Sequence, residues 1–192
     1  MEETTEIDWN VPKSIIAAAC LNTKDHYSYL IGYSDGTVRP NGRITRAEVA
    51  TIFYRLLQDE ARENVWSRTN SYSDVASGVW YNSAVSTLTN AGILTGYEDG
   101  TFRPNQNIKR DEAMKIINKV LFRTPDKEHF LPDMITWPDN SDTDAWYYTD
   151  VQEATNNHDY ERVNNTSPET WTELRPPRDW DALEAELSQK YP

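Results

Sequence analysis

The chain has 192 residues with 19 basic and 31 acidic side chains, which gives a formal net charge of −12. This negative charge argues against nucleic acid as a partner, because phosphate binding depends on cationic neutralisation. It also argues against electrostatic attachment to anionic lipid, and no apolar run approaches the roughly 18 residues that membrane insertion needs. The 7 Trp, 11 Tyr and 4 Phe are too many aromatic residues for a disordered acidic tail, so we expect a folded domain.

The first residues, 1–6, have neither the basic stretch nor the apolar core of a secretory signal peptide. The sequence therefore leaves open a cytosolic protein and a processed piece of a longer secreted chain. Cys20 is the single cysteine, which excludes an internal disulfide and favours a small buried thiol.

An internal repeat is the main signal in the sequence. The segment GYSDGTVRPN at residues 32–41 recurs as GYEDGTFRPN at residues 96–105, an offset of 64. The correspondence continues without a gap to Leu57 and Leu121, and half of the aligned positions are identical. Such self-similarity is typical of a chain built from stacked structural repeats.

Each copy is predicted to form a helix, a loop and a second helix. In the second copy the leading helix is expected over residues 79–91, with Gly92 as its C-terminal stop. The Asp99-Gly100 pair predicts a turn, and the Arg103-Pro104-Asn105 segment is expected to be extended because Pro disfavours helix before it. The second helix should bury a stripe made of Ala113, Ile117, Val120 and Leu121.

In the first copy the second helix begins with a predicted capping box, in which the side chains of Thr45 and Glu48 each bond the other residue's amide. The leading helix of this copy is expected over residues 11–21, where an apolar helical run comes after Pro12, a favourable first-turn residue.

A degenerate third copy is expected downstream. Residues 144–148 align with residues 78–82, and Arg178 occupies the place of Arg110, whereas the glycine-containing turn is replaced by residues 159–165. The expected fold is therefore all-α, with helix-loop-helix repeats over residues 7–62, 63–124 and 125–192 that together form one compact domain.

The pattern of an aromatic-led helix, then GILTGYEDGTFRPN, then ITRAE at the start of a second helix resembles the surface-layer homology (SLH) module of bacterial cell-surface proteins. The resemblance covers residues 30–57 and 72–121, and it is weaker over 137–187. It implies a pseudo-threefold, three-repeat bundle that anchors an extracellular protein of a Gram-positive bacterium to secondary cell-wall polysaccharide. It also implies a passenger domain in a longer surface protein, a pyruvylated sugar as ligand in many members, and no cofactor.

The resemblance further implies that the Arg of the TRAE motif lies in a groove between repeats and meets the acidic sugar. A guanidinium can hold the carboxylate of a pyruvyl group through two charge-assisted hydrogen bonds. Arg46 lies in the first helical turn, where free amides and the helix dipole would also favour an anion. The candidate carbohydrate-binding residues are Arg46, Thr45, Glu48, Arg110, Lys109, Gly32, Tyr33, Asp35, Gly96, Tyr97, Asp99, Trp80, Trp146 and Arg178.

The second copy departs from the motif, since Lys109 replaces the Thr and Asp111 replaces the Ala. Asp111 can pair with Arg110 or repel an acidic ligand, and the third copy keeps only Arg178. Arg46 is therefore the preferred site.

Plainer interpretations stand beside these site assignments. Trp80 and Trp146 are at helix starts, where a tryptophan is more often a core anchor than a platform for a sugar. Asp35 and Asp99 serve turn geometry first, and Arg39 and Arg103 can pair with neighbouring carboxylates.

Neither a metal site nor an enzyme is expected. Residues 139–144 resemble a calcium loop, but they lack its central Gly and terminal Glu, so a capped helix start is favoured. The three histidines are scattered and form no zinc motif. No nucleotide-binding or nucleophile motif is present, and a protein–protein interaction module on the same scaffold is the alternative to wall anchoring.

Overall fold

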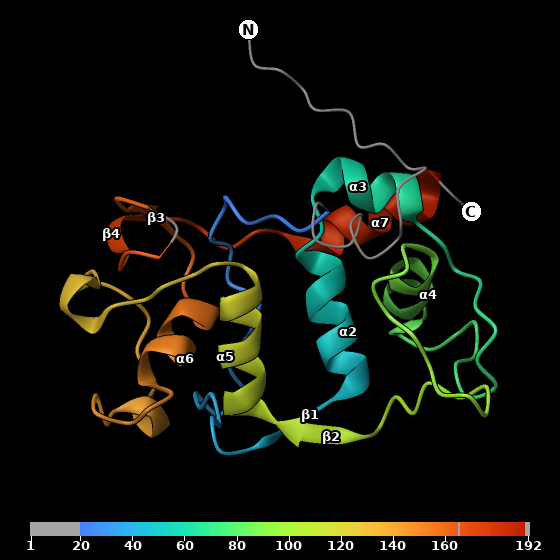
Figure 1. The fold of residues 1–192 in the computed structure, drawn as a ribbon, viewed down its shortest axis with the longest axis horizontal. Coiled ribbons are helices and arrows are strands. Elements are labelled where there is room, and N and C mark those ends of the chain that lie inside the picture. Colours follow the sequence, from blue (N-terminus) through green and yellow to red (C-terminus); the bar gives the residue numbers. More distant parts are fainter. Residues whose placement is uncertain (1–19, 165, 191–192) are drawn as a thin grey trace, which may run out of the picture. The chain divides into compact units, whose positions relative to one another are not determined.

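The computed structural model describes residues 20–164 and 166–190 (Figure 1). The expected helix over residues 11–21 lies outside the described residues except for its last two positions. The elements in chain order are β1 (Arg43–Thr45), α2 (Arg46–Arg55), α3 (Asp59–Val65), α4 (Asn82–Asn90), β2 (Asn107–Lys109), α5 (Arg110–Val120), η1 (Lys127–His129), η2 (Pro138–Asn140), α6 (Tyr148–Thr155), β3 (His158–Glu161), β4 (Thr170–Leu174) and α7 (Trp180–Lys190).

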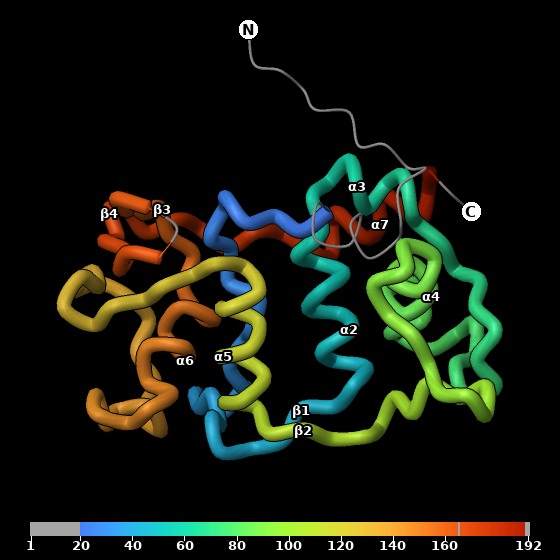
Figure 2. The backbone as a smooth tube through the Cα atoms, viewed as in Figure 1, coloured from blue at the N-terminus to red at the C-terminus, as the bar shows by residue number. Residues whose placement is uncertain are grey.

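The chain divides into two compact units that do not follow the boundaries of the sequence repeats. The first unit contains Arg46–Gln106 with residues 20–22, and the second contains Thr23–Thr45 with the described residues from Asn107 onward. In the first unit α2 packs against α4, and in the second α5 packs against α6, which lies beside it in Figure 2. Each unit therefore joins the second helix of one repeat to the leading helix of the next.

The second helices begin directly after a short strand in both repeats, and they bury one face as helical periodicity requires. In α5 and at its end, Ala113, Ile117 and Leu121 are buried as predicted. Val120 is 41% exposed, so its assignment to the buried stripe is wrong.

The leading helix of the second repeat is shorter than expected. Residues 78–81 form turns, with hydrogen bonds from the Val79 amide to the Ala76 carbonyl and from the Asn82 amide to the Val79 carbonyl. The helix α4 starts only at Asn82. Its C-terminal end is confirmed, because Gly92 follows it with a φ of 71°, a value that favours glycine.

The expectation of an all-α fold is wrong, because the described residues contain two antiparallel two-stranded sheets. In the first, the equivalent segments before the two second helices pair with each other, with Ile44 opposite Ile108. In the second, β3 pairs with β4, where Trp171 is buried between the exposed Thr170 and Thr172. β-branched and aromatic residues in such alternation favour a strand over a helix.

Among the described residues, no helix has both the length and the apolar character that crossing a membrane would require.

Candidate functional site

The two glycine-containing turns have the same backbone geometry. The Tyr33 amide donates to the Thr37 carbonyl at 2.7 Å, and the Tyr97 amide donates to the Thr101 carbonyl at 2.8 Å. Gly36 and Gly100 have φ values of 79° and 76°, which side chains rarely tolerate. The prediction that these Asp-Gly pairs serve as turns is confirmed.

One aspartate organises each turn. Asp35 accepts hydrogen bonds from the amide and the hydroxyl of Thr37 and forms an ion pair with Arg39 at 2.7 Å. These bonds, with the Thr37 hydroxyl first among them, lower the pKa of Asp35 to about 2. Asp99 repeats the arrangement with Thr101 and with Arg103, which confirms that both arginines pair with nearby carboxylates.

The residues before the prolines are not extended. Arg39 and Arg103 have φ values of 50° and 58°, in the left-handed region. The backbone at Arg103 is held there because the two carboxylate oxygens of Asp74 accept from the amides of Phe102 and Arg103, each at 2.8 Å. Asp139 holds the first turn in the same way at Val38 and Arg39.

An arginine from the other repeat clamps each turn. Arg46 donates through Nε to the Phe102 carbonyl at 3.0 Å, and its Cζ lies 5.2 Å from the ring centre of Tyr97. Arg110 donates to the Val38 carbonyl at 3.0 Å, and its Cζ lies 5.2 Å from the ring centre of Tyr33. We call each turn with its clamping arginine a turn assembly: residues 96–105 with Arg46, and residues 32–41 with Arg110.

The two assemblies therefore gather most of the predicted site residues. Gly96, Tyr97 and Asp99 come together with Arg46 in the first unit, and Gly32, Tyr33 and Asp35 come together with Arg110 in the second.

The assemblies differ in how accessible their arginines are. Arg110 is only 5% exposed, whereas Arg46 is partly exposed. In the part of the chain that the structure describes, Arg46 contacts carbonyls and aromatic rings, and no carboxylate pairs with its guanidinium. Its positive charge is therefore not neutralised locally.

The first two amides of α2 and of α5 are bonded to backbone carbonyls and are not the free amides that were expected. The amides of Arg46 and Ala47 donate to the carbonyls of Gln106 and Pro104, and the first two amides of α5 are bonded in the same way to Gly42 and Pro40. Anion binding at Arg46 would therefore depend on its side chain. The capping box of Thr45 and Glu48 stays a prediction; Thr45 ends β1 and Glu48 lies in the first turn of α2.

The two candidate tryptophans are exposed. Trp80 is 64% exposed and Trp146 is 52% exposed, so the interpretation of both as core anchors is wrong. Each forms a T-shaped contact with the tyrosine that follows it, and the Nζ of Lys115 lies 4.9 Å from the Trp146 ring centre. Both indoles are therefore open to a ligand.

The remaining candidates lie apart from the turns. Lys109 is exposed and pairs with Glu112 at 3.6 Å, and the guanidinium of Arg178 stacks on the rings of Tyr27 and Trp180.

Two further pairs of residues shape the turns and are missing from the sequence-based candidates. Asp74 and Asp139 hold the turn backbones, and two residues before them Tyr72 and Trp137 pack where a Cβ of Gly96 or Gly32 would lie. A sequence pattern could have revealed them: an aromatic residue followed two positions later by an aspartate occurs at residues 72–74 and again at residues 137–139, an offset of 65.

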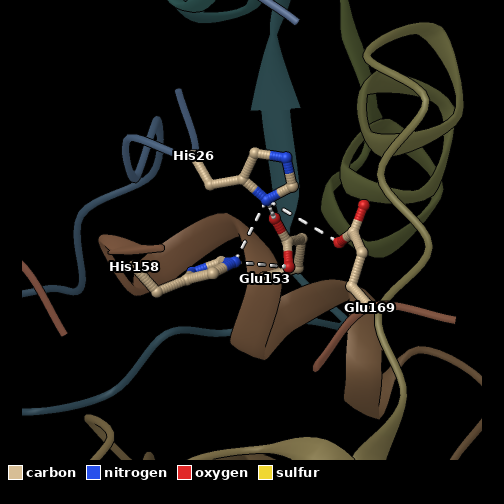
Figure 3. A group of neighbouring side chains, drawn as sticks. All are labelled: His26, Glu153, His158 and Glu169. Carbon is tan, nitrogen blue, oxygen red and sulfur yellow. Dashed lines mark hydrogen bonds and ion pairs between the residues drawn. The ribbon is translucent and has the colours of Figure 1, made fainter. Parts of the chain in front are cut away.

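One cluster of buried side chains has the composition of a metal site. His26, Glu153, His158 and Glu169 bring four possible ligand atoms within 4.8 Å of one another (Figure 3). Burial lowers the pKa of His26 to about 2 and that of His158 to about 4, and it raises the pKa of Glu169 to about 7.

Comparison with known proteins gives one family. Residues 29–50 and 71–114 match the sequence model of the S-layer homology domain. The chain is 33% identical over 134 residues to a cellulosome-anchoring protein of Acetivibrio thermocellus, covering 70% of the chain and 29% of that protein. It is 40% identical over 104 residues to cell surface glycoprotein 1 of the same organism, covering 54% of the chain and 4% of that protein.

A third relative is the surface-layer 125 kDa protein of Lysinibacillus sphaericus, which is 36% identical over 86 residues, covering 45% of the chain and 7% of that protein. The chain thus spans less than a third of the length of these three relatives. No solved structure matches the chain significantly.

Proposed function

Because this chain belongs to the S-layer homology family through residues 29–50 and 71–114, we propose that it attaches a bacterial surface protein non-covalently to secondary cell-wall polysaccharide. The family assigns the chain to the cell surface, and relatives described as cellulosome-anchoring, surface-layer and middle cell wall proteins support an anchoring role. A passenger domain in a longer surface protein is part of the proposal, since the relatives extend far beyond the matched segment.

The unneutralised guanidinium of Arg46 carries the proposal for the ligand. In a chain with a net charge of −12, a partly exposed cation without a carboxylate partner among residues 20–164 and 166–190 is a local attraction for an anion. Its Nε is taken by the Phe102 carbonyl and one terminal nitrogen contacts the Thr95 carbonyl, so the rest of the guanidinium edge is available. A carboxylated sugar, such as a pyruvylated unit, fits this chemistry.

Besides a cation for the carboxylate, a sugar site needs aromatic faces, and the chain has such faces near its exposed turns. Tyr97 lies against the guanidinium of Arg46, and Trp80 presents an exposed indole in the turn before α4. Flat rings with a polar edge pack well on the apolar faces of sugars. We therefore assign the turn assembly of Arg46, residues 96–105, as the principal binding site and the assembly of the buried Arg110 as a weaker one.

Some relatives are enzymes, among them an amylopullulanase of Thermoanaerobacterium thermosulfurigenes, of which the match covers only 4%. The catalytic activity of such a protein does not extend to this chain through so small a shared segment. We propose a non-catalytic anchoring module.

The experiment is sedimentation of the purified chain with isolated Gram-positive wall sacculi, before and after extraction of the wall polymers with hydrofluoric acid. Binding is expected to untreated walls and to be lost after extraction. The Arg46→Ala variant should bind about tenfold more weakly, because it removes a charge-assisted contact. The Arg68→Ala variant, which removes the same charge from an exposed position between α3 and α4, should bind like the wild type.

Helicity measured by circular dichroism must be equal in the two variants, since Arg46 also clamps the turn. Unchanged wall binding by Arg46→Ala would remove this residue from the site. Equal binding to extracted walls would overturn the polysaccharide as ligand and favour the alternative, a module that binds a protein partner.

A further inference from the structure

Four buried side chains in the second unit converge on one point. His26 comes from the segment before the first turn, Glu153 from α6, His158 from the start of β3, and Glu169 from the residue before β4. All four side chains are fully buried. Figure 3 shows them directed toward one another from three separate parts of the chain.

The spacing of the four side chains is close to that of a coordination tetrahedron, with one possible ligand atom from each residue within 4.8 Å of the others. The Nδ1 of His26 lies 3.1 Å from the Nε2 of His158, 3.0 Å from the Oε1 of Glu153 and 3.7 Å from the Oε2 of Glu169. The Nε2 of His158 lies 3.4 Å from the Oε2 of Glu153. A tetrahedral ion with ligands at about 2.0 to 2.1 Å separates those ligands by about 3.3 Å.

The hydrogen bonds around His158 leave a lone pair facing the centre. Its Nδ1 lies 3.1 Å from the Asn156 carbonyl, which can only accept a proton, so Nδ1 carries the hydrogen. The Nε2 of the neutral ring therefore faces the Glu153 carboxylate with a lone pair. A backbone carbonyl that orients the second nitrogen is the usual companion of a metal-binding histidine.

His26 is held differently. Its ring stacks on Tyr160 with the ring centres 3.9 Å apart, and its outward nitrogen, Nε2, has no hydrogen-bond partner among the described residues.

Glu153 and Glu169 each pair with an arginine through one carboxylate oxygen only, and in the described part of the chain the second oxygen is left without a hydrogen bond. Arg162 pairs with Oε1 of Glu169 at 2.9 Å, and Arg123 pairs with Oε1 of Glu153 at 3.4 Å. The Oε2 atoms of both glutamates are buried without a hydrogen-bond partner among the described residues. A buried acceptor without a donor destabilises the fold, and a cation at the centre would remove this cost at both oxygens.

We propose that His26, Glu153, His158 and Glu169 bind one divalent transition-metal ion, with zinc as the best match, in a closed structural site. Two imidazoles and two carboxylates suit zinc better than magnesium or calcium, which prefer ligand sets made only of oxygen. Four protein ligands leave no open position for catalysis. The ion would fasten the segment around residue 26 and the β3–β4 hairpin to α6.

The competing explanation needs no ion: Arg123 and Arg162 neutralise the two glutamates, and the Nδ1 of His26 donates its hydrogen to the Nε2 of His158 or the Oε1 of Glu153. The test uses the full chain, purified without a tag and stripped with a chelator, to which ZnCl₂ is then added. One equivalent of zinc should bind, measured by elemental analysis after gel filtration, and the melting temperature should rise. Co²⁺ in place of zinc should show the intense visible absorption of a four-coordinate site.

The variants His158→Gln and Glu169→Gln each remove one ligand and should bind zinc at least about tenfold more weakly. Their matched controls are His129→Gln and Glu173→Gln, at exposed positions outside the cluster, which should bind like the wild type.

The proposal is overturned if the wild-type chain binds no zinc and its melting temperature does not respond, because the arginines then suffice. Equal zinc binding by the ligand variants and the controls would also overturn it, because the ion would lie elsewhere. If a ligand variant fails to fold, the Co²⁺ spectrum of the wild type decides, since six-coordinate surface binding lacks the intense absorption.

Discussion

Trp137 packs directly against Gly32, so that a Cβ at position 32 would overlap the far edge of the indole ring. The two residues belong to different repeats but to the same compact unit. Tyr72 packs against Gly96 in the other unit, at the equivalent position of the second turn. The first glycine of each repeated turn therefore provides space for an aromatic ring.

Gly32→Ala should lower the free energy of unfolding by about 1 to 3 kcal/mol, the usual cost of overpacking. The ring cannot move aside freely, because Nε1 of Trp137 donates to the Thr155 hydroxyl at 2.9 Å. Chemical denaturation followed by tryptophan fluorescence measures the change. Gly78→Ala is the control, since a Cβ there meets no atom within 4 Å, and it should be close to neutral. Equal stability of the two variants would mean that the indole does not occupy this space.

Much of each turn assembly could be predicted from the sequence, because its determinants are local. The Asp-Gly pair sets the turn, and the arginine four residues after the aspartate lies within reach of its carboxylate. The partner of each turn could not be predicted. Arg46 and Arg110 occupy equivalent positions at the start of the second helix of each repeat. The neighbouring sequence does not indicate that each arginine contacts the turn of the other repeat.

The strands and the buried cluster were missed for related reasons. The strands β1 and β2 have three residues each, which is too short for an alternating pattern to be recognised. His26 and His158 are far apart in the sequence and show no metal-binding spacing, so only the folded chain brings them together.

The stabilisation of the turn at residues 32–41 by Asp35 should persist to an unusually low pH. The pKa of Asp35 is about 2 in the folded protein against an ordinary 3.8, so its stabilising contribution is complete above pH 3.8 and is lost as the pH falls toward 2. The hydroxyl of Thr37 is the main cause. In Thr37→Val the pKa of Asp35 should therefore rise toward 3.8, as measured by NMR titration of the carboxyl carbon.

Asp99 is the internal control in the same sample, because its partner Thr101 is unchanged and its pKa should stay at about 2. A pKa of Asp35 that stays at about 2 in Thr37→Val would show that Arg39 and the amide of residue 37 lower it without the hydroxyl.

Trp80→Ala separates a binding role from a packing role, because the indole is 64% exposed. Its free energy of unfolding should stay within about 0.5 kcal/mol of the wild type, as for most surface substitutions. Trp171→Ala, at a residue that is 2% exposed, should lose about 3 to 5 kcal/mol. If Trp80 contacts the wall polysaccharide, its variant should sediment with wall sacculi several-fold less than the wild type. A stable variant with full wall binding would remove Trp80 from the carbohydrate site, and a large loss of stability would instead restore the role of core anchor.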